Sequence, residues 1–481
     1  MWTLRTVVAL AAFALSSSAC APQKSGLEAV ADAMGATTLN SIEYSGSGLL
    51  FGFGQAYLPG EPWPRFFQRS YAVSVNYQTP AMRLETVRSQ AEVPPHGGAA
   101  QPVAGEQRTI LLVSAQDAWT QAGDQATPNP GTAPDRLRQL WATPHGVVKA
   151  ALANGGTLEG NTISVMVEGR AVTATLNDQM LVERVQYLST NEVVGDYPVE
   201  IAYSDYADHG GVKFPAHIMQ TEDGHPTLDL VVTDVRPNAT VAIDVPANVP
   251  GAPEPPAVPP VQVTKLGDGA WYFTAAGGHN WAVEFRDHVV VVEGFGSEAR
   301  SLAVIQEIGK TIPGKPIRYV INTHSHYDHS GGLRPYVALG ATVVTHELNK
   351  AFFEAAWARP RTIKPDTLSK APKPPVFDTV GDMKVMTDGT QRLELYHMTK
   401  TGHHGANLIV YLPKGGVVYW GDGYNPPPGD DPRDPSRTPE YGIDLYRTIE
   451  QRKLAVRTIA PAHGAGVRPY DSLKRAIGLI P

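Results

Sequence analysis

The chain has 481 residues, and 42% of them are hydrophobic, so it is long enough for two or three domains with packed cores. Its formal net charge is −7 and it contains no block of Lys and Arg residues, which argues against nucleic-acid binding. A single cysteine excludes an intramolecular disulfide, so core packing must supply much of the stability.

Residues 1–20 have the pattern of an export signal: Arg5 is followed by a short apolar core and then by small residues. The apolar core is too short to span a bilayer. Cys20 stands where a bacterial lipoprotein would be cleaved and acylated, whereas cleavage near Ala19 or Ala21 would release a soluble protein. Both alternatives place the protein in the bacterial envelope, on the periplasmic side, and acylation of Cys20 would add a membrane anchor.

Residues 21–245 are predicted to form a β-rich domain. Alternation of apolar and polar residues predicts strands that include 71–77, 162–167, 199–203 and 228–232. Short helical patterns cover 27–34 and 135–152, and Pro144 should kink or split the second one. We therefore expect an antiparallel, strongly curved sheet with helix packed on it, and a loop at 94–105.

The histidines of this domain lack the spacing of metal ligands, and most are expected on the surface: His96, His145, His209, His217 and His225.

Residues 246–260 contain seven prolines and are predicted to be an extended linker between two domains. Beyond it, residues 261–481 mix strands and helices. The predicted strands are 261–266, 270–274, 282–285, 289–293, 317–322, 341–345, 393–398, 408–412 and 416–419. The predicted helices are 298–309, 333–339, 346–358, 441–453 and 470–477.

A cluster of histidines directly follows the apolar run 317–322. Residues 323–332 read Thr-His-Ser-His-Tyr-Asp-His-Ser-Gly-Gly. Neutral imidazole nitrogens and a carboxylate oxygen are the ligands that zinc and similar divalent ions accept. Further candidates follow in order: Gly402-His403-His404, then Gly421-Asp422, then Pro461-Ala462-His463-Gly464. Each lies beside an apolar run.

These four motifs resemble the metallo-β-lactamase superfamily of metallohydrolases. The resemblance covers roughly residues 261–481 and implies an αββα sandwich with its site at one edge of two sheets. It also implies one metal held by His324, His326 and His403, a second held by Asp328, His329 and His463, and Asp422 between them. Two zinc ions are the expected cofactors, with iron or manganese as alternatives.

Four residues near the motifs have open roles. Tyr327 is predicted to pack beneath the metal loop, and His404 either polarises a substrate carbonyl or faces solvent. His279 either borders the active site or is an exposed loop histidine, the interpretation we favour. Tyr424 follows Asp422 closely, and we expect it to contact the substrate.

The resemblance predicts hydrolysis of an ester, lactone, thioester or amide of a small-molecule substrate, by a hydroxide that bridges the metals while Asp328 orients it. Three alternatives stay open. They are a β-lactam hydrolase, which the Gly421-Asp422 motif disfavours, an iron-dependent dioxygenase of the same fold, and a lipid- or protein-binding envelope lipoprotein with an auxiliary metal domain.

Overall fold

The computed structural model describes residues 26–481 except 255, 257–258 and 430. The predicted export signal and Cys20 lie outside the described residues. Within them, no helix is both long enough and apolar enough to cross a membrane.

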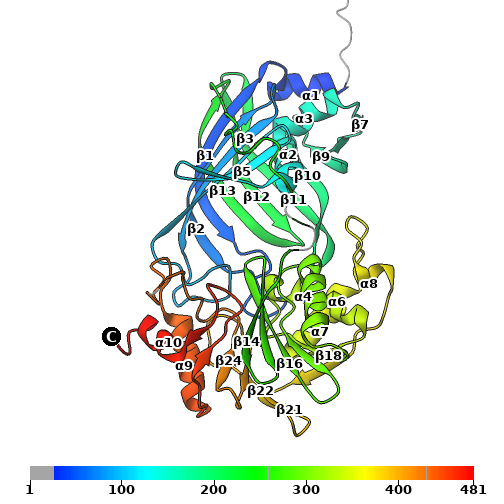
Figure 1. The fold of residues 1–481 in the computed structure, drawn as a ribbon. Helices are drawn as coiled ribbons and strands as arrows, with labels where there is room; N and C mark the ends of the chain where they lie inside the picture. The colour runs from blue at the N-terminus through cyan, green and yellow to red at the C-terminus, as the bar shows by residue number, and fades with distance from the viewer. Residues whose placement is uncertain (1–25, 255, 257–258, 430) are drawn as a thin grey trace, which may run out of the picture.

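The N-terminal part is one antiparallel sheet of thirteen strands, in the order β6-β5-β4-β3-β2-β1-β13-β12-β11-β10-β9-β8-β7 (Figure 1). Its strands are β1 (Ser41–Phe51), β2 (Arg65–Asn76), β3 (Ala81–Gln90), β4 (Glu106–Ser114), β5 (Asp117–Ala122), β6 (Gln125–Pro128), β7 (Thr157–Glu159), β8 (Thr162–Val167), β9 (Arg170–Leu176), β10 (Val182–Asn191), β11 (Gly195–His209), β12 (Val212–Glu222) and β13 (His225–Pro237).

The central strands of this sheet are bent at bulges. The pairing of β1 with β13 shifts register between Ser45 and Gly46. A Cβ on Gly46 would stand 2.1 Å from the carbonyl oxygen of Val231, so only glycine allows this close approach of the two backbones. Bulges increase local twist and bend, which agrees with the predicted curvature.

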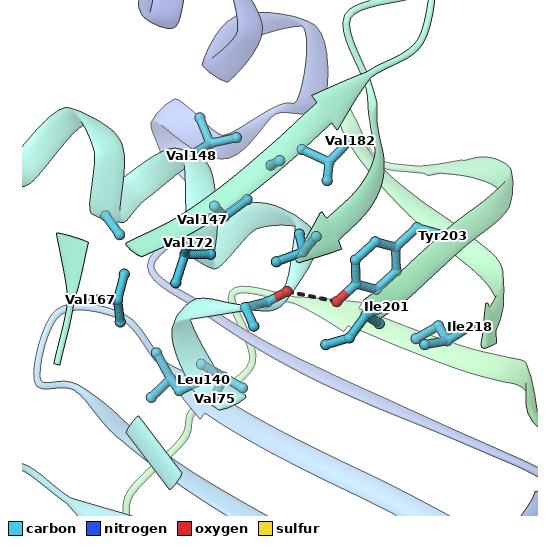
Figure 2. Packing of buried hydrophobic residues seen from close by; sticks show 14 of the residues in the cluster. Val75, Leu140, Val147, Val148, Val167, Val172, Val182, Ile201, Tyr203 and Ile218 are labelled. Atoms are coloured by element: carbon cyan, nitrogen blue, oxygen red, sulfur yellow. Dashed lines mark hydrogen bonds between the residues drawn. The ribbon is translucent and has the colours of Figure 1, made fainter. Parts of the chain in front are cut away.

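Helices cover one end of the sheet: α1 (Gly26–Met34), α2 (Ala133–Trp141) and α3 (Pro144–Ala153). Pro144 begins α3, and Thr143 caps it by accepting the N–H of Gly146, so the proline splits the helical pattern in two. Their apolar faces pack on the sheet around Leu140 and Val147, and Tyr203 donates a hydrogen bond to the carbonyl oxygen of Ala142 (Figure 2). Short 3₁₀ turns η1 (Ala36–Thr38) and η2 (Pro130–Thr132) complete this part.

The predicted linker begins on the first sheet. Val249 is buried against Ile110 and Trp119, and Asn248 donates to the carbonyl oxygen of Ala126.

Two further sheets follow. One has seven strands in sequential order: β14 (Gln262–Gly267), β15 (Ala270–Ala275), β16 (Gly278–Glu284), β17 (Val289–Val292), β18 (Ile317–Ile321), β19 (Thr342–His346) and β20 (Phe377–Val380). The other has six: β21 (Met383–Thr387), β22 (Arg392–His397), β23 (Leu408–Leu412), β24 (Val417–Tyr419), β25 (Thr458–Ile459) and β26 (Arg468–Pro469).

Helices lie outside both sheets, which gives the αββα sandwich. Apolar side chains of the two sheets, such as Trp281 and Val410, share one core. A second core packs the seven-stranded sheet against α4 (Glu298–Thr311), α6 (Arg334–Leu339) and α7 (Glu347–Trp357). A third packs the six-stranded sheet against α9 (Glu440–Gln451) and α10 (Tyr470–Ala476). The short helices α5 (Tyr327–Ser330) and α8 (Thr367–Lys370) lie in loops.

The segment after α7 joins the sandwich to the first sheet. Arg359 makes a bidentate pair with Asp223, at 2.7 and 2.8 Å. The Arg361 guanidinium donates to the carbonyl oxygens of residues 191–193. The two parts therefore meet through specific polar contacts.

Candidate metal centre

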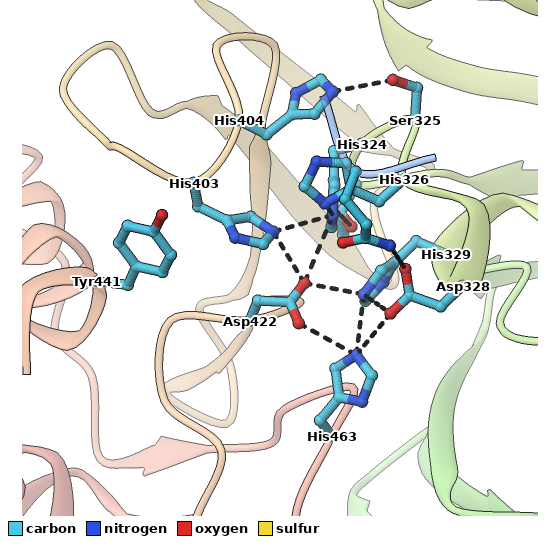
Figure 3. Close-up of polar contacts among 12 residues, drawn as sticks. His324, Ser325, His326, Asp328, His329, His403, His404, Asp422, Tyr441 and His463 are labelled. Atoms are coloured by element: carbon cyan, nitrogen blue, oxygen red, sulfur yellow. Dashed lines mark hydrogen bonds and ion pairs between the residues drawn. The ribbon is translucent and has the colours of Figure 1, made fainter. Parts of the chain in front are cut away.

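The four predicted motifs meet at one edge of the sandwich. The first motif follows β18 in the seven-stranded sheet. His403 lies between β22 and β23, Asp422 follows β24, and His463 follows β25, all in the six-stranded sheet. Strands that end at the same edge bring their following loops together, and Figure 3 shows the resulting cluster of imidazoles and carboxylates.

One group of ligand atoms comes from His324, His326, His403 and Asp422. The Nε2 atom of His324 lies 3.0 Å from Nδ1 of His326 and 3.2 Å from Nε2 of His403. The Asp422 Oδ2 atom is 3.0 Å from Nε2 of His403.

A second group comes from Asp328, His329, Asp422 and His463. The Nε2 atoms of His329 and His463 are 3.0 Å apart, and Nε2 of His463 is 3.2 Å from Oδ2 of Asp328. Asp422 takes part in both groups, because its Oδ2 also lies 2.9 Å from Nε2 of His329 and its Oδ1 3.1 Å from Nε2 of His463.

The donor atoms fit around metal ions better than they fit one another. Ligands bonded to zinc at about 2.0–2.1 Å in a tetrahedron are separated by about 3.3 Å. The neighbouring atoms of both groups lie 2.9–3.2 Å apart, close to that value. Nε2 of His324 faces two other ring nitrogens, and one ring proton can satisfy only one such contact. A shared cation would satisfy all of these lone pairs.

Buried hydrogen bonds hold three of these imidazoles in the tautomer that a metal needs. The ring nitrogen of His324 opposite to its ligand atom, Nδ1, lies 2.9 Å from Oγ1 of Thr323. Nδ1 of His329 donates to Oε2 of Glu293 at 3.0 Å, and Nε2 of His326 donates to the carbonyl oxygen of Ala56 at 2.9 Å. Such outer partners leave the other nitrogen free of its proton and aim it at the metal.

Glu293 is a supporting residue that the sequence analysis missed. It is fully buried, has a φ of 82°, and accepts a hydrogen bond from Oγ1 of Thr323 at 2.6 Å as well as from His329. A bulky residue with positive φ is strained, and such strain is typical of functional sites. The available signal was an acidic residue placed directly after the four valines of β17.

The N-terminal part reaches into the centre through residues 52–64 and 94–105. Gln55 donates from Nε2 to Oδ1 of Asp328 at 2.8 Å, and its Oε1 accepts the N–H of Ala99 at 2.9 Å. A Cβ on Gly98 would stand 2.0 Å from Oε1 of Gln55 and 2.7 Å from Cε1 of His326, so glycine is needed where the second loop passes over the site. No spacing rule could have connected Gln55 with Asp328 across 273 residues.

Charge is divided unequally between the two groups. Burial, together with neighbouring imidazoles, lowers the pKa of His324, and burial lowers that of His326 to about 3. Both rings are therefore neutral, which is the form that binds metal. Burial works against the charged form of His463, but Asp422 and Asp328 outweigh it and raise its pKa to about 9. Without metal, this second group holds protons that a bound cation would displace.

The other candidate residues have mixed outcomes. Tyr327 packs as predicted, but against Phe53 of the N-terminal part, with ring centroids 5.3 Å apart. The solvent-facing interpretation of His404 is wrong, because the side chain is fully buried, 2.9 Å from Oγ of Ser325, and its action on a substrate carbonyl stays a prediction. The favoured interpretation of His279 is also wrong, because it is a buried residue of β16 whose Nε2 donates to the carbonyl oxygen of Gly464, beside His463.

Tyr424 lines a cavity of about 210 Å³ that also includes Asp422. Its hydroxyl is buried, and Ser472 lies close to it. The predicted role of Tyr424 in substrate contact stays a prediction. Among the surface histidines predicted for the N-terminal part, His145 is an exception, because it is fully buried.

Comparison with known proteins finds both sequence relatives and structural neighbours. The chain is 29% identical over 170 residues to the 2,4-dinitroanisole O-demethylase subunit beta of Nocardioides sp. (strain JS1661). That match spans 35% of this chain and about half of the relative, 48%.

Among solved structures, a metallo-beta-lactamase from Pontibacter korlensis shares 21% identity, with 46% of this chain and 98% of that chain covered and a TM-score of 0.35. The metallo-beta-lactamase FIM-1 from Pseudomonas aeruginosa, in its mono-zinc form, shares 19% identity, with 47% and 96% covered and the same TM-score of 0.35.

Residues 273–463 match the metallo-beta-lactamase superfamily, and this range includes all seven predicted ligands. With this match, the αββα sandwich and the converging His and Asp side chains, the chain carries a metallo-β-lactamase superfamily domain.

Proposed function

We propose that the protein is a binuclear, zinc-dependent hydrolase that cleaves a carbonyl-type bond, such as an ester, lactone, thioester or amide. The observation that carries the proposal is the carboxylate of Asp422, whose two oxygens face the ligand atoms of both groups. A single shared carboxylate suits two ions held side by side. When bound, two such ions supply Lewis-acid polarisation of the substrate and lower the pKa of a water molecule.

Different residues of the protein would bind the ions and transfer the proton. His324, His326 and His403 would hold one ion, and Asp328, His329 and His463 the other. The side chain of Asp328 is 37% exposed, against 14% for Asp422. It is therefore the carboxylate that a substrate-side water would reach most readily, and we propose that Asp328 orients that water and accepts its proton.

Gln55 would keep that carboxylate in position. Its amide donates to Oδ1 of Asp328, which leaves Oδ2 toward His463 and the site. Tyr424 would contribute a buried hydroxyl donor on the Asp422 side of the pocket.

The similarity to the 2,4-dinitroanisole O-demethylase subunit beta suggests a second candidate reaction. The name of that relative describes removal of a methyl group from the oxygen of a nitro-substituted aromatic ether. Attack of water on the electron-poor ring carbon, with release of methanol, would use the same residues in the same roles. Nitroaryl methyl ethers therefore belong in the substrate panel.

The test is a turnover assay on esters, lactones, thioesters, β-lactams and nitroaryl ethers, with zinc-loaded and chelator-treated protein. Asp422→Asn should reduce turnover by several orders of magnitude, because it removes the charge shared by both ligand groups. Asp471→Ala, at an aspartate whose side chain is 61% exposed, is the matched control and should keep full activity. Turnover by Asp422→Asn at the wild-type rate would contradict the proposal.

We also propose that the protein acts in the bacterial envelope, either free or anchored through an acylated Cys20. Mass spectrometry of the mature protein from the native host would show whether Cys20 begins the chain and carries lipid.

A further inference from the structure

The curved sheet of the N-terminal part encloses a cavity of about 420 Å³, separate from the metal centre. It is lined from seven neighbouring strands, β4 through β1 and β13 to β11, and from α2. On β2, β3, β4, β11 and β12 the lining residues alternate, for example Met82, Leu84, Thr86 and Arg88 of β3, so on these strands they belong to one face of the sheet. The volume falls in the range typical of small-molecule sites.

The polarity of the lining changes along the cavity. On β3 it passes from Met82 and Leu84 to Thr86 and Arg88, and on β12 from Ile218 to Gln220 and Glu222. Strands β3 and β12 run in the same direction, so both gradients become polar toward the same end of the sheet, although strand pairing places Arg88 level with Ile218 and not with Glu222.

The apolar end lies beside the helices. There Tyr44 pairs with Val73, and Tyr203 bonds to the carbonyl oxygen of Ala142 between α2 and α3.

The polar end lies beside the metallo-β-lactamase-type domain. Glu222 pairs with His225 at the turn, and Leu228 pairs with Leu50 near the end of β1, just before the loop that carries Gln55. Phe53 lines the cavity and contacts Tyr327 of the metal loop, with ring centroids 5.3 Å apart.

The polar end offers both a donor and a carboxyl group. The guanidinium of Arg88 is anchored by Oε1 of Gln107, and the carboxyl of Glu222 by Tyr197 and Gln220. A cation and a carboxyl at one end disfavour a ligand with a strong net charge and favour an uncharged head that can both donate and accept hydrogen bonds.

We infer that this cavity binds a single-chain amphiphile, with its apolar chain toward α2 and α3 and its uncharged polar head, such as a hydroxyl, ester or amide, toward the metal domain. In the part of the cavity that is lined by Leu, Met, Ile, Val and aromatic side chains, water finds few hydrogen-bond partners, whereas an alkyl chain buries its apolar surface there. Binding does not require any reaction at the metal centre.

The test is calorimetric titration of the zinc-loaded full chain with 1-octanol, 1-nonanol and 1-decanol. These probes share a head and differ only in chain length. If the chain enters the cavity, affinity should rise about fourfold for each added methylene, with one site per protein. An absence of binding up to the solubility limit, or an affinity that does not change with chain length, would overturn the inference.

Two cavity variants and one surface variant locate the site. Leu84→Trp and Leu111→Trp each place a large side chain in the cavity from a half-buried position, and each should weaken 1-decanol binding at least tenfold while zinc content stays unchanged. Val231→Trp is the matched control, because Val231 is 54% exposed and lies on the opposite face of β13 from Leu230.

Circular dichroism checks the fold of each variant, and the second cavity variant stands in if one of them fails to fold. An equal loss of binding in Val231→Trp would mean that the alkanol adsorbs to the protein surface, and this result would overturn the inference. Assembly of two chains through this face with no alkanol bound would overturn it as well.

Discussion

At the scale of single residues, the metal centre depends on partners contributed from far away in the sequence. Gln55 donates a hydrogen bond to Oδ1 of Asp328, and the carbonyl oxygen of Ala56 accepts one from Nε2 of His326. Both partners come from the loop after β1, which belongs to the other part of the molecule. The N-terminal part therefore contributes to the metal site directly.

Gln55→Leu should weaken zinc binding at the Asp328, His329 and His463 group by about 10–100-fold, because an unsupported ligand loses its orientation. Competition with a fluorescent chelator would measure this loss. Gln186→Leu is the control, since Gln186 bonds to Glu200 on an exposed part of β10. Zinc affinity equal to that of the wild type in Gln55→Leu would mean that the amide is dispensable for the site.

The motif residues themselves were predictable because ligand-type side chains stand close together in the sequence, beside apolar runs. Four of the ligands lie within six residues after one apolar run: His324, His326, Asp328 and His329. The other three each lie next to a different apolar run: His403, Asp422 and His463. The structure brings all seven together. Gln55 and Glu293 could not be found in this way, because ordinary glutamine and glutamate side chains acquire their roles only through the fold.

At the scale of secondary-structure elements, α3 places a titratable group in an apolar core. His145 lies in the first turn of α3, fully buried and stacked on Phe214, with Nε2 3.1 Å from the carbonyl oxygen of Met34. Burial lowers the pKa of His145 to about 4 from an ordinary value of 6.5.

This pKa predicts a stability loss in acid. The folded pKa lies below the unfolded one, so the contribution of neutral His145 is present above pH 6.5 and is lost as the pH falls toward 4, where the unfolded chain binds the extra proton. The loss should approach about 3 kcal/mol. Urea unfolding of the protein at pH 7.5, 5.5 and 4.5 would measure it.

His145→Gln should remove most of this dependence on pH, whatever its stability at pH 7.5. His209→Gln, at a partly exposed position, should leave the dependence unchanged. An identical slope in His145→Gln and the wild type would show that other groups cause the acid loss.

Most elements could be predicted from their local pattern. Pro144 splits a helix as proline chemistry requires, and the apolar runs before each motif are strands. The missed strands β20, β21, β25 and β26 have two to five residues and lack a clear alternation. His279 and His404 were misjudged because burial of a histidine depends on the loops that cover it.

At the scale of the whole molecule, the segment after α7 holds the two parts together. Arg361 is central: its side chain is 4% exposed, it donates to the carbonyl oxygens of Asn191, Glu192 and Val193, and Asp366 lies 3.6 Å away. These acceptors form the turn between β10 and β11. The contact fixes the position of the first sheet over the sandwich.

Arg361→Ala should destabilise the protein by roughly 2–4 kcal/mol, because three carbonyl groups, that of Val193 in a buried contact, and Asp366 lose their partner. Differential scanning calorimetry should then resolve separate unfolding of the two parts. Arg318→Ala removes an arginine whose side chain is 47% exposed and should change stability by less than about 1 kcal/mol. A wild-type thermogram for Arg361→Ala would contradict this role.

The arrangement of the two parts was beyond sequence reasoning. The prolines of 246–260 marked a boundary, but local patterns carry no information on which loop of the first sheet meets which loop of the sandwich. Contacts such as Gln55 with Asp328 and Phe53 with Tyr327 join residues more than 270 positions apart, and only the folded molecule shows them.

The most direct measurement is elemental analysis of the purified, signal-free protein by mass spectrometry, with metals counted per chain. A binuclear hydrolase should contain about two zinc ions per chain, and Asp422→Asn should retain fewer. Stoichiometric iron with oxygen uptake, or no metal after reconstitution with zinc, would contradict the central proposal.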